Sequence, residues 1–395
     1  MNWTTDRRDG NEGQAQMELT SGALLWTVLG LTVLVTGATV WQWPRLARPG
    51  WTSVLARLGA LLTAQLGLVL VAALLINGYG DFYPTWDDLL GSDQQVTFGP
   101  STGNAGDALP TAHGSRLVRP DGSSPAWPAG RPASVGALAS VRVLGPRTGL
   151  HQQAYVYLPP QYFQPAYART RFPVLVMMTG YPGTIATTLD RLNPPREASR
   201  LITEGRMQPT VLVLVSQNVA LPRDTNCVDS VGGPAVETYF TDELPTALRS
   251  AYRLAPGPDS WAVEGYSEGG TCALAFGLRH PSVYGVVADL GGDYGLYENR
   301  QTGTLFGPPG PDREHLLQQA DFNWRLTHLP QPSIRVLLGT AVKDRDYPAT
   351  KRFLAEVRAP LRATPMLLQT GGHNFGTWAV EQGPMLEWIS GQLAH

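Results

Sequence analysis

The residues best suited to chemistry lie in the run Gly265-Tyr266-Ser267-Glu268-Gly269, a Gly-x-Ser-x-Gly pattern. The run follows an apolar segment at 261–264 and precedes a helical pattern at 268–279. A strand, a sharp turn and a helix in this order are typical of a nucleophile elbow, in which a strained backbone presents the serine hydroxyl. Ser267 is therefore the predicted nucleophile. The alternative is a structural serine at a glycine-rich helix start.

A serine hydroxyl needs a base that takes its proton during attack, and histidine suits that task at neutral pH. His373 lies in the run GGHNF, after an apolar strand pattern and before a helical one, where a loop can reach the end of a sheet. We predict that His373 is this base. The remaining histidines are expected to be structural or solvent-exposed: His113, His151, His280, His315, His328 and His395.

The third member of a serine triad orients the imidazole and stabilises its charged form. Asp344 and Asp346 both follow the apolar segment at 334–339. We take Asp344 as the first choice and keep Asp346 as the alternative.

Attack on a carbonyl carbon builds negative charge on the oxygen, which backbone N–H groups can stabilise. The N–H of Glu268 directly follows the nucleophile and is the first predicted donor. The N–H of Tyr181, in the run TGYPG after an apolar strand, is the second, because Pro182 has no N–H to donate. A simple turn is the alternative for this run.

Short apolar runs alternate with amphipathic stretches after about residue 135, a pattern that predicts a mostly parallel sheet with crossover helices and hence the α/β class. The expected strands are 154–158, 174–179, 211–215, 261–264, 284–290, 334–339 and 366–370. The expected helices are 236–252, 268–279, 349–357 and 377–393.

Two uncharged runs, 19–44 and 58–80, are each long enough to cross a bilayer. They predict a transmembrane hairpin at 19–80. A tail at 1–18 precedes the hairpin. A Gly/Pro/Ser-rich linker at 81–135 and a catalytic domain at 136–395 follow it. Arg45, Arg48 and Arg57 lie in the connector, so the positive-inside rule places the connector in the cytoplasm and both termini outside. A signal peptide or a pair of core helices is the alternative.

Two cysteines, Cys227 and Cys272, occur in the chain. In an outward-facing domain they could form a disulfide closing a loop of about 45 residues, worth roughly 4 kcal/mol in the chain-entropy model. In the cytosol they would stay thiols, and a metal site is disfavoured because no histidine lies at ligand spacing beside them. No metal or cofactor is expected. The net charge of −2 and the absence of a basic block argue against a nucleic-acid partner.

Several segments together resemble the esterase family that includes esterase D (S-formylglutathione hydrolase), feruloyl esterases and mycolyltransferases. The matching runs are AYVYLPPQY, GYSEGG with a later RHP, GTAVKD and GGHNFGTW, within a stretch from about Val135 to the end. The runs FYPTWDDLLG, DTNCVD and GGTCA also resemble membrane-attached members. The resemblance implies the α/β-hydrolase fold and oxygen or thiol esters as substrates. The stretch 294–332 departs from the family in its Gly and Pro content, and the acid is offset from the usual spacing, which keeps Asp346 open.

These observations predict an extracytoplasmic serine esterase of a multi-pass membrane protein, acting through an acyl-serine intermediate. A cell-envelope acyltransferase with the same triad is the first alternative, and a non-catalytic envelope-binding module is the second. A peptidase is disfavoured by the resemblance. The expected partners are a small ester or thioester, or an envelope lipid or glycan, together with the lipid bilayer.

Overall fold

The computed structural model of the protein describes residues 19, 21–47, 49–80, 115–122, 124–342, 344 and 346–394. The predicted tail at 1–18, the first part of the predicted linker, Arg48, His113 and His395 lie outside the described residues. Contacts divide the chain into two units, 1–95 and 96–395, which are described separately.

The first unit contains two long helices, α1 (Gly22–Leu46) and α2 (Trp51–Gly80), both long and apolar enough to cross a membrane. Their large apolar side chains face outward, as Trp26, Leu34 and Leu66 show with exposed fractions of 70%, 69% and 60%. Such exposure does not fit helices buried in a protein core. It leaves a membrane anchor or a signal sequence as the interpretations of this unit.

The two helices pack closely at Gly67 of α2. A Cβ atom on Gly67 would lie 2.5 Å from the hydroxyl oxygen of Thr32 on α1. The Thr32 hydroxyl donates to the Val28 carbonyl oxygen at 2.7 Å, so it is satisfied within its own helix. Small residues at such points let apolar helices approach each other in the way that membrane helices do.

The second unit is built on a nine-stranded sheet with the order β1-β2-β3-β5-β4-β6-β7-β8-β9. Pairing is antiparallel from β1 to β5 and parallel from β5 to β9, which confirms the predicted α/β class with a mostly parallel sheet. The strands are β1 (Val118–Pro120), β2 (Ala137–Leu144), β3 (His151–Leu158), β4 (Val174–Met178), β5 (Val211–Val215), β6 (Trp261–Tyr266), β7 (Val286–Leu290), β8 (Arg335–Ala341) and β9 (Arg362–Leu368).

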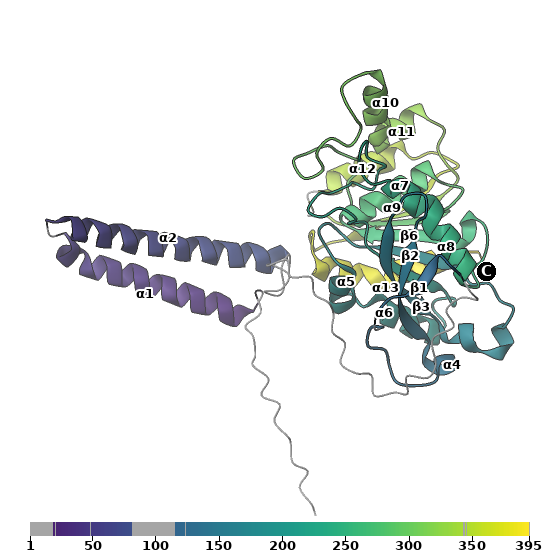
Figure 1. Ribbon diagram of the computed structural model, residues 1–395, viewed down its shortest axis with the longest axis horizontal. Coiled ribbons are helices and arrows are strands. Elements are labelled where there is room, and N and C mark those ends of the chain that lie inside the picture. Colours follow the sequence, from purple (N-terminus) through teal and green to yellow (C-terminus); the bar gives the residue numbers. More distant parts are fainter. Residues whose placement is uncertain are drawn as a thin grey trace, which may run out of the picture. The chain divides into compact units, whose positions relative to one another are not determined.

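Helices cover both faces of this sheet because alternate side chains of each strand point to opposite sides (Figure 1). On β4, Val174 and Val176 join one core cluster, whereas Leu175 joins the other. Residues of α7 (Val236–Thr238), α8 (Leu244–Ala251), α9 (Glu268–Arg279), α11 (Phe322–His328) and α12 (Tyr347–Glu356) pack into the first cluster, and those of α5 (Ile185–Arg191), α6 (Pro194–Thr203) and α13 (Phe375–Gln392) into the second.

Shorter elements complete the unit. A π-helical turn joins α7 to α8 at Tyr239–Glu243, and α10 (Pro311–Ala320) precedes α11. A short helix α4 (Pro132–Val135) and three 3₁₀ turns lie outside the sheet, at Pro160–Phe163, Pro165–Tyr167 and Pro258–Ser260.

The structure differs from the predicted linker boundary at residue 135. Val118–Pro120 forms the edge strand β1, which pairs antiparallel with β2, and Trp127 packs with its ring centroid 5.2 Å from that of Tyr157. The predicted linker therefore ends earlier than expected. Strand β1 has only three residues and lies in a stretch rich in glycine and proline. A run this short has no detectable hydrophobic periodicity, so it could not be predicted from the sequence.

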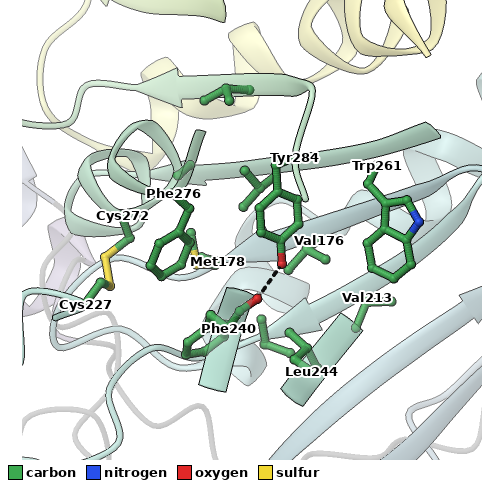
Figure 2. Packing of buried hydrophobic residues seen from close by; sticks show 14 of the residues in the cluster. Val176, Met178, Val213, Cys227, Phe240, Leu244, Trp261, Cys272, Phe276 and Tyr284 are labelled. Atoms are coloured by element: carbon green, nitrogen blue, oxygen red, sulfur yellow. Dashed lines mark hydrogen bonds between the residues drawn. A yellow bond between two sulfur atoms is a disulfide. The ribbon is translucent and has the colours of Figure 1, made fainter. Parts of the chain in front are cut away.

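Large aromatic side chains fill the core cluster on the face of the sheet that α9 covers (Figure 2). Trp261 begins β6, and Phe276 of α9 stacks on Phe240 with ring centroids 5.9 Å apart. The buried hydroxyl of Tyr284 donates to the Phe240 carbonyl oxygen at 2.7 Å. These contacts hold β6 and α9 in fixed positions, and the turn between them carries Ser267.

Candidate functional site

Ser267 occupies the turn between β6 and α9 in a strained backbone conformation, with φ 55° and ψ −130°. A positive φ is uncommon outside glycine and is found at functional sites. Glycine is required on both sides of this turn because backbone atoms of neighbouring segments lie too close to leave room for a Cβ atom. A Cβ on Gly265 would lie 2.3 Å from the carbonyl carbon of Gly269, and a Cβ on Gly269 would lie 2.4 Å from the Thr179 carbonyl oxygen. The strained turn thus brings α9 against the end of β4.

The imidazole of His373 meets this serine, with Nε2 2.8 Å from Ser267 Oγ. The loop between β9 and α13 carries the histidine and is shaped by Gly371, whose φ is 134°. The Asn374 side chain caps α13 by accepting from the Thr377 N–H at 3.0 Å. The ring of Trp378, on the first turn of α13, contacts the imidazole edge to face at 5.2 Å. This packing limits the rotation of His373.

Both predicted acids lie near the histidine, and they differ in their contacts. Asp346 Oδ2 is 3.7 Å from His373 Nδ1, an ion-pair distance. Asp344 is buried, and its Oδ1 accepts the N–H of Asp346 at 3.1 Å. The contacts therefore favour the second choice from the sequence, Asp346, as the partner of the imidazole, with Asp344 holding the turn that carries it.

Two further carboxyl groups are buried beside these aspartates. Desolvation raises the pKa of Asp289, at the end of β7, to about 8, and the nearby Asp293 and Asp346 add to the shift. Desolvation likewise raises the pKa of Glu381 on α13 to about 8, with smaller contributions from Asp289 and Asp344. Both groups are therefore largely neutral near pH 7.

The two predicted N–H donors are carried by elements beside the serine. Glu268 is the first residue of α9, where backbone N–H groups have no partner within the helix. The loop 179–184 follows β4, and a Cβ on Gly180 would lie 3.2 Å from the Cβ of Ser267. The bond between Tyr181 and Pro182 is cis. The loop that carries Tyr181 thus lies against the nucleophile.

The side chain of Glu268 contacts the loop after β5. Its Oε1 accepts from Asn226 Nδ2 at 2.6 Å. Desolvation raises the pKa of Glu268 well above 4.5, and the neighbouring Asp224 and Asp293 add to this. A disulfide joins Cys227, the next residue of the loop, to Cys272 on α9, with 5.6 Å between the Cα atoms.

Within the part of the chain that the structure describes, two groups of side chains have the types and spacing to hold a metal ion: Cys227 with Glu268 and Cys272, and Asp344 with Asp346 and His373. Cysteines in a disulfide cannot serve as thiolate ligands, so the first group is not suited to a metal in this form. In the second, His373 Nε2 is engaged with the serine hydroxyl. This pairing suits a proton-transfer role for the second group.

Sequence reasoning missed Trp378, Asn218 and Asn226. Asn218 donates from Nδ2 to the Gly180 carbonyl oxygen at 3.0 Å and to the Gly183 carbonyl oxygen at 2.8 Å. It follows β5 by three residues, so a polar side chain just past the carboxyl end of a strand was the available signal. No local pattern indicated the contacts of Asn226, because its partners Glu268 and Tyr297 lie far away in the chain. Trp378 is only five positions from His373, so its place in the first turn after the histidine loop was the available signal.

Comparison with known proteins identifies the family of this chain. Residues 146–380 match the model of the family described as "Putative esterase". An uncharacterized protein of Corynebacterium glutamicum is 28% identical over 270 residues, which make up 65% of this chain and 62% of that protein. The chain thus spans about three fifths of the curated relative that it matches.

Solved structures with low sequence identity share the fold. A ferulic acid esterase is 17% identical with a TM-score of 0.53, and the aligned region covers 65% of this chain and 98% of the esterase chain. An S-formylglutathione hydrolase from Agrobacterium tumefaciens is 16% identical with a TM-score of 0.53, over 66% and 96%. MPT51 of Mycobacterium tuberculosis is 16% identical with a TM-score of 0.50, over 65% and 99%. These neighbours confirm the α/β-hydrolase fold predicted from the sequence.

Proposed function

The chain belongs to this esterase family of α/β-hydrolases and is a hydrolase or acyltransferase, and from this premise we propose that it is an extracytoplasmic serine esterase working through an acyl-Ser267 intermediate. The observation that carries the proposal is the 2.8 Å contact between Ser267 Oγ and His373 Nε2 at a strained strand-to-helix turn. The proposed substrates are esters of small molecules.

In the proposed reaction, His373 Nε2 takes the hydroxyl proton as Ser267 Oγ attacks the ester carbonyl carbon. Asp346 stabilises the imidazolium through Nδ1 and fixes the ring orientation, and Asp344 holds the turn beneath it. The charge that develops on the carbonyl oxygen is stabilised by the N–H groups of Tyr181 and Glu268. One such donor contributes on the order of 3 kcal/mol to the transition state.

Collapse of the tetrahedral intermediate expels the alcohol, which receives its proton from His373 and leaves an acyl-Ser267 ester. Water then attacks that ester with His373 again as base, and the acid product leaves with the serine restored. If a sugar or lipid hydroxyl takes the place of water, the same groups perform acyl transfer.

The cellular placement is part of the proposal. The exposed apolar helices α1 and α2 support a membrane hairpin. Arg45 and Arg57 lie within the helices, in the last turn of α1 and near the start of α2, and not in the connector as expected from the sequence. With Arg48 between them in the sequence, they still favour a cytoplasmic side for the connector. The catalytic domain would then lie outside, where an oxidising environment would maintain the bond between Cys227 and Cys272.

Hydrolysis of chromogenic esters tests the proposed activity. The full chain in detergent should hydrolyse short acyl esters, and Ser267→Ala should lower kcat on the order of a millionfold. Esters of graded chain length would define the acyl preference. Equal turnover by wild type and Ser267→Ala would refute the acyl-serine route.

Adding sugar or lipid alcohols to the same assay distinguishes hydrolysis from transfer. An esterase releases free acid whether or not the acceptor is present. Recovery of an acylated acceptor, with a matching fall in free acid, would identify a transferase.

A further inference from the structure

One stretch of chain, residues 217–228 after β5, contacts both elements that carry the proposed oxyanion donors; we call it the clamp segment. We propose that the clamp segment fixes the directions of the two donor N–H groups, with Asn218 and Asn226 as positioning residues. This inference rests on the proposed acyl-serine mechanism and assigns roles to residues that have no part in the proton transfers.

Asn218 acts on the donor at Tyr181 through peptide geometry. Its Nδ2 donates to the carbonyl oxygen of Gly180, and that carbonyl shares a planar trans peptide unit with the Tyr181 N–H. The two groups of a trans peptide point in opposite directions. Holding the Gly180 oxygen toward Asn218 therefore turns the Tyr181 N–H the other way. The second bond of Asn218, to the Gly183 oxygen, fixes the far side of the same loop.

A second contact joins the loop 179–184, which carries Tyr181, to the clamp segment. The Tyr181 hydroxyl donates to the Pro222 carbonyl oxygen at 2.6 Å. Hydrogen bonds thus run in both directions between the loop and the clamp segment. Their donors and acceptors are side-chain and backbone groups that have no other part in the proposed mechanism.

Asn226 acts on the donor at Glu268. Its Nδ2 donates to Glu268 Oε1 at 2.6 Å, and its Oδ1 accepts the N–H of Tyr297 at 2.8 Å. The bond between Asn226 and Glu268 holds the Glu268 side chain, and Glu268 is the first residue of α9 and supplies a proposed donor N–H. Immediately afterwards, Cys227 is joined by the disulfide to Cys272, one turn further along the same helix. Two adjacent residues therefore fasten the clamp segment to the first turns of α9.

The backbone of the clamp segment is strained at these two residues. Asn226 and Cys227 have φ values of 47° and 58°, in the left-handed region. The N–H of Asn226 is held by Asp224 Oδ1 at 2.8 Å. Strain of this kind persists where surrounding contacts over-determine the conformation, and it is concentrated at functional sites. Here it directs the amide of Asn226 at Glu268.

A positioning role affects the transition state more than substrate binding. Loss of one donor lowers kcat by about 100- to 1,000-fold in serine hydrolases, and a displacement of about 1 Å can lower it about 100-fold. Because the donors stay present and only their directions loosen, we expect about 10- to 100-fold lower kcat for Asn218→Ala and for Asn226→Ala. KM should stay within about twofold.

The experiment measures kcat and KM of the full chain on a short chromogenic ester, together with inhibition by phenylboronic acid. The boronate forms a tetrahedral adduct with the serine, so its inhibition constant should rise with the fall in kcat. Asp229→Ala is the matched control. Asp229 is exposed and lies directly after the clamp segment, and its carboxylate accepts from the backbone N–H of Thr238 at 2.9 Å and from the Thr238 hydroxyl at 2.5 Å. It should keep wild-type kcat.

Thermal unfolding and thiol titration accompany each variant. Should Asn226→Ala expose free thiols or unfold, Asn218→Ala decides the question, because Asn218 is nine positions before Cys227 whereas Asn226 is adjacent to it. Folded variants with the kcat and boronate affinity of the control would overturn the inference while leaving the proposed function intact. A wild type that neither turns over esters nor binds the boronate would overturn the proposed function and the inference with it.

Discussion

At the scale of single residues, the proposed mechanism depends on side chains that meet although they are far apart in sequence. Ser267 and His373 are 106 positions apart and lie 2.8 Å from each other. Both could be predicted because each lies in a short pattern with glycines at a strand end. The acid could not be chosen from the sequence, because Asp344 and Asp346 are separated by one residue and only the local turn decides which one faces the imidazole.

The two aspartates can be separated by amide substitutions. Asp346→Asn should lower kcat/KM for a short ester by about 1,000- to 10,000-fold, because a neutral amide cannot stabilise the imidazolium. Asp344→Asn should lower it by less than about tenfold, since the amide oxygen can still accept the N–H of residue 346. Steady-state kinetics measures both. A larger loss for Asp344→Asn would transfer the role to Asp344.

Glu268 gives the reaction a predicted alkaline limit. Desolvation raises its pKa, so the neutral acid persists to higher pH than in an ordinary glutamate. Ionisation at higher pH adds negative charge to the first turn of α9, whose N–H group is a proposed oxyanion donor. Activity should therefore fall as this group loses its proton. Glu268→Gln, which keeps an acceptor for Asn226, should retain more activity at high pH. The acid limb of the kcat/KM profile serves as the internal control, and an unchanged alkaline limb would refute the role of Glu268.

At the scale of elements, the turn between β6 and α9 is the part most tightly restricted by packing. Gly269→Ala would place a Cβ 2.4 Å from the Thr179 carbonyl oxygen and 2.7 Å from that of Met178, both backbone atoms. We expect a loss of about 3 kcal/mol in the free energy of unfolding, together with a large loss of activity. Denaturant unfolding monitored by tryptophan fluorescence measures the first.

Gly391→Ala is the matched control for that substitution. Gly391 lies near the end of α13, is exposed, and a Cβ there would have no atom within 4 Å. Alanine favours a helix over glycine by about 0.5–1 kcal/mol, so this variant should be slightly more stable. Equal stability of the two alanine variants would contradict the packing argument for the elbow.

The sequence predicted buried central elements better than peripheral ones. Strand β5 begins and ends where the apolar run 211–215 does, and α9 occupies the predicted 268–279. Strand β9 begins at Arg362, four residues before the predicted start, because this outer strand is largely exposed and lacks a continuous apolar run. Strand β1 and helices α5, α6, α10 and α11 were missed for related reasons: they are short, amphipathic or contain proline. Strand β2 was also missed, although it has eight residues and is mostly buried.

At the scale of the whole molecule, an exposed apolar hairpin and an α/β-hydrolase domain belong to one chain. The hairpin could be predicted from length and composition alone, since an uncharged run of that length is unusual in a soluble domain. Its orientation depends on a few arginines. The same orientation determines whether the cysteine pair is in an oxidising compartment, so one topology measurement bears on both proposals.

A reporter fused after His395 tests this placement. If the connector between α1 and α2 is cytoplasmic, a reporter that is active only outside the cytoplasm should give signal, and one that is active only inside should not. Reversing the arginine bias by replacing Arg45, Arg48 and Arg57 and adding arginines beyond α2 should weaken the external signal. A cytoplasmic signal from the wild-type fusion would remove the proposed localisation.

The central claim, that Ser267 is a nucleophile activated by His373, is tested most directly by a fluorophosphonate probe followed by peptide mass analysis. The account predicts a single phosphonyl adduct on the peptide that contains Ser267 in the wild type. It predicts no adduct in Ser267→Ala and labelling slowed by at least about 1,000-fold in His373→Ala, because the hydroxyl then has no base. A folded wild type that stays unlabelled, or one labelled equally well after either substitution, would contradict it.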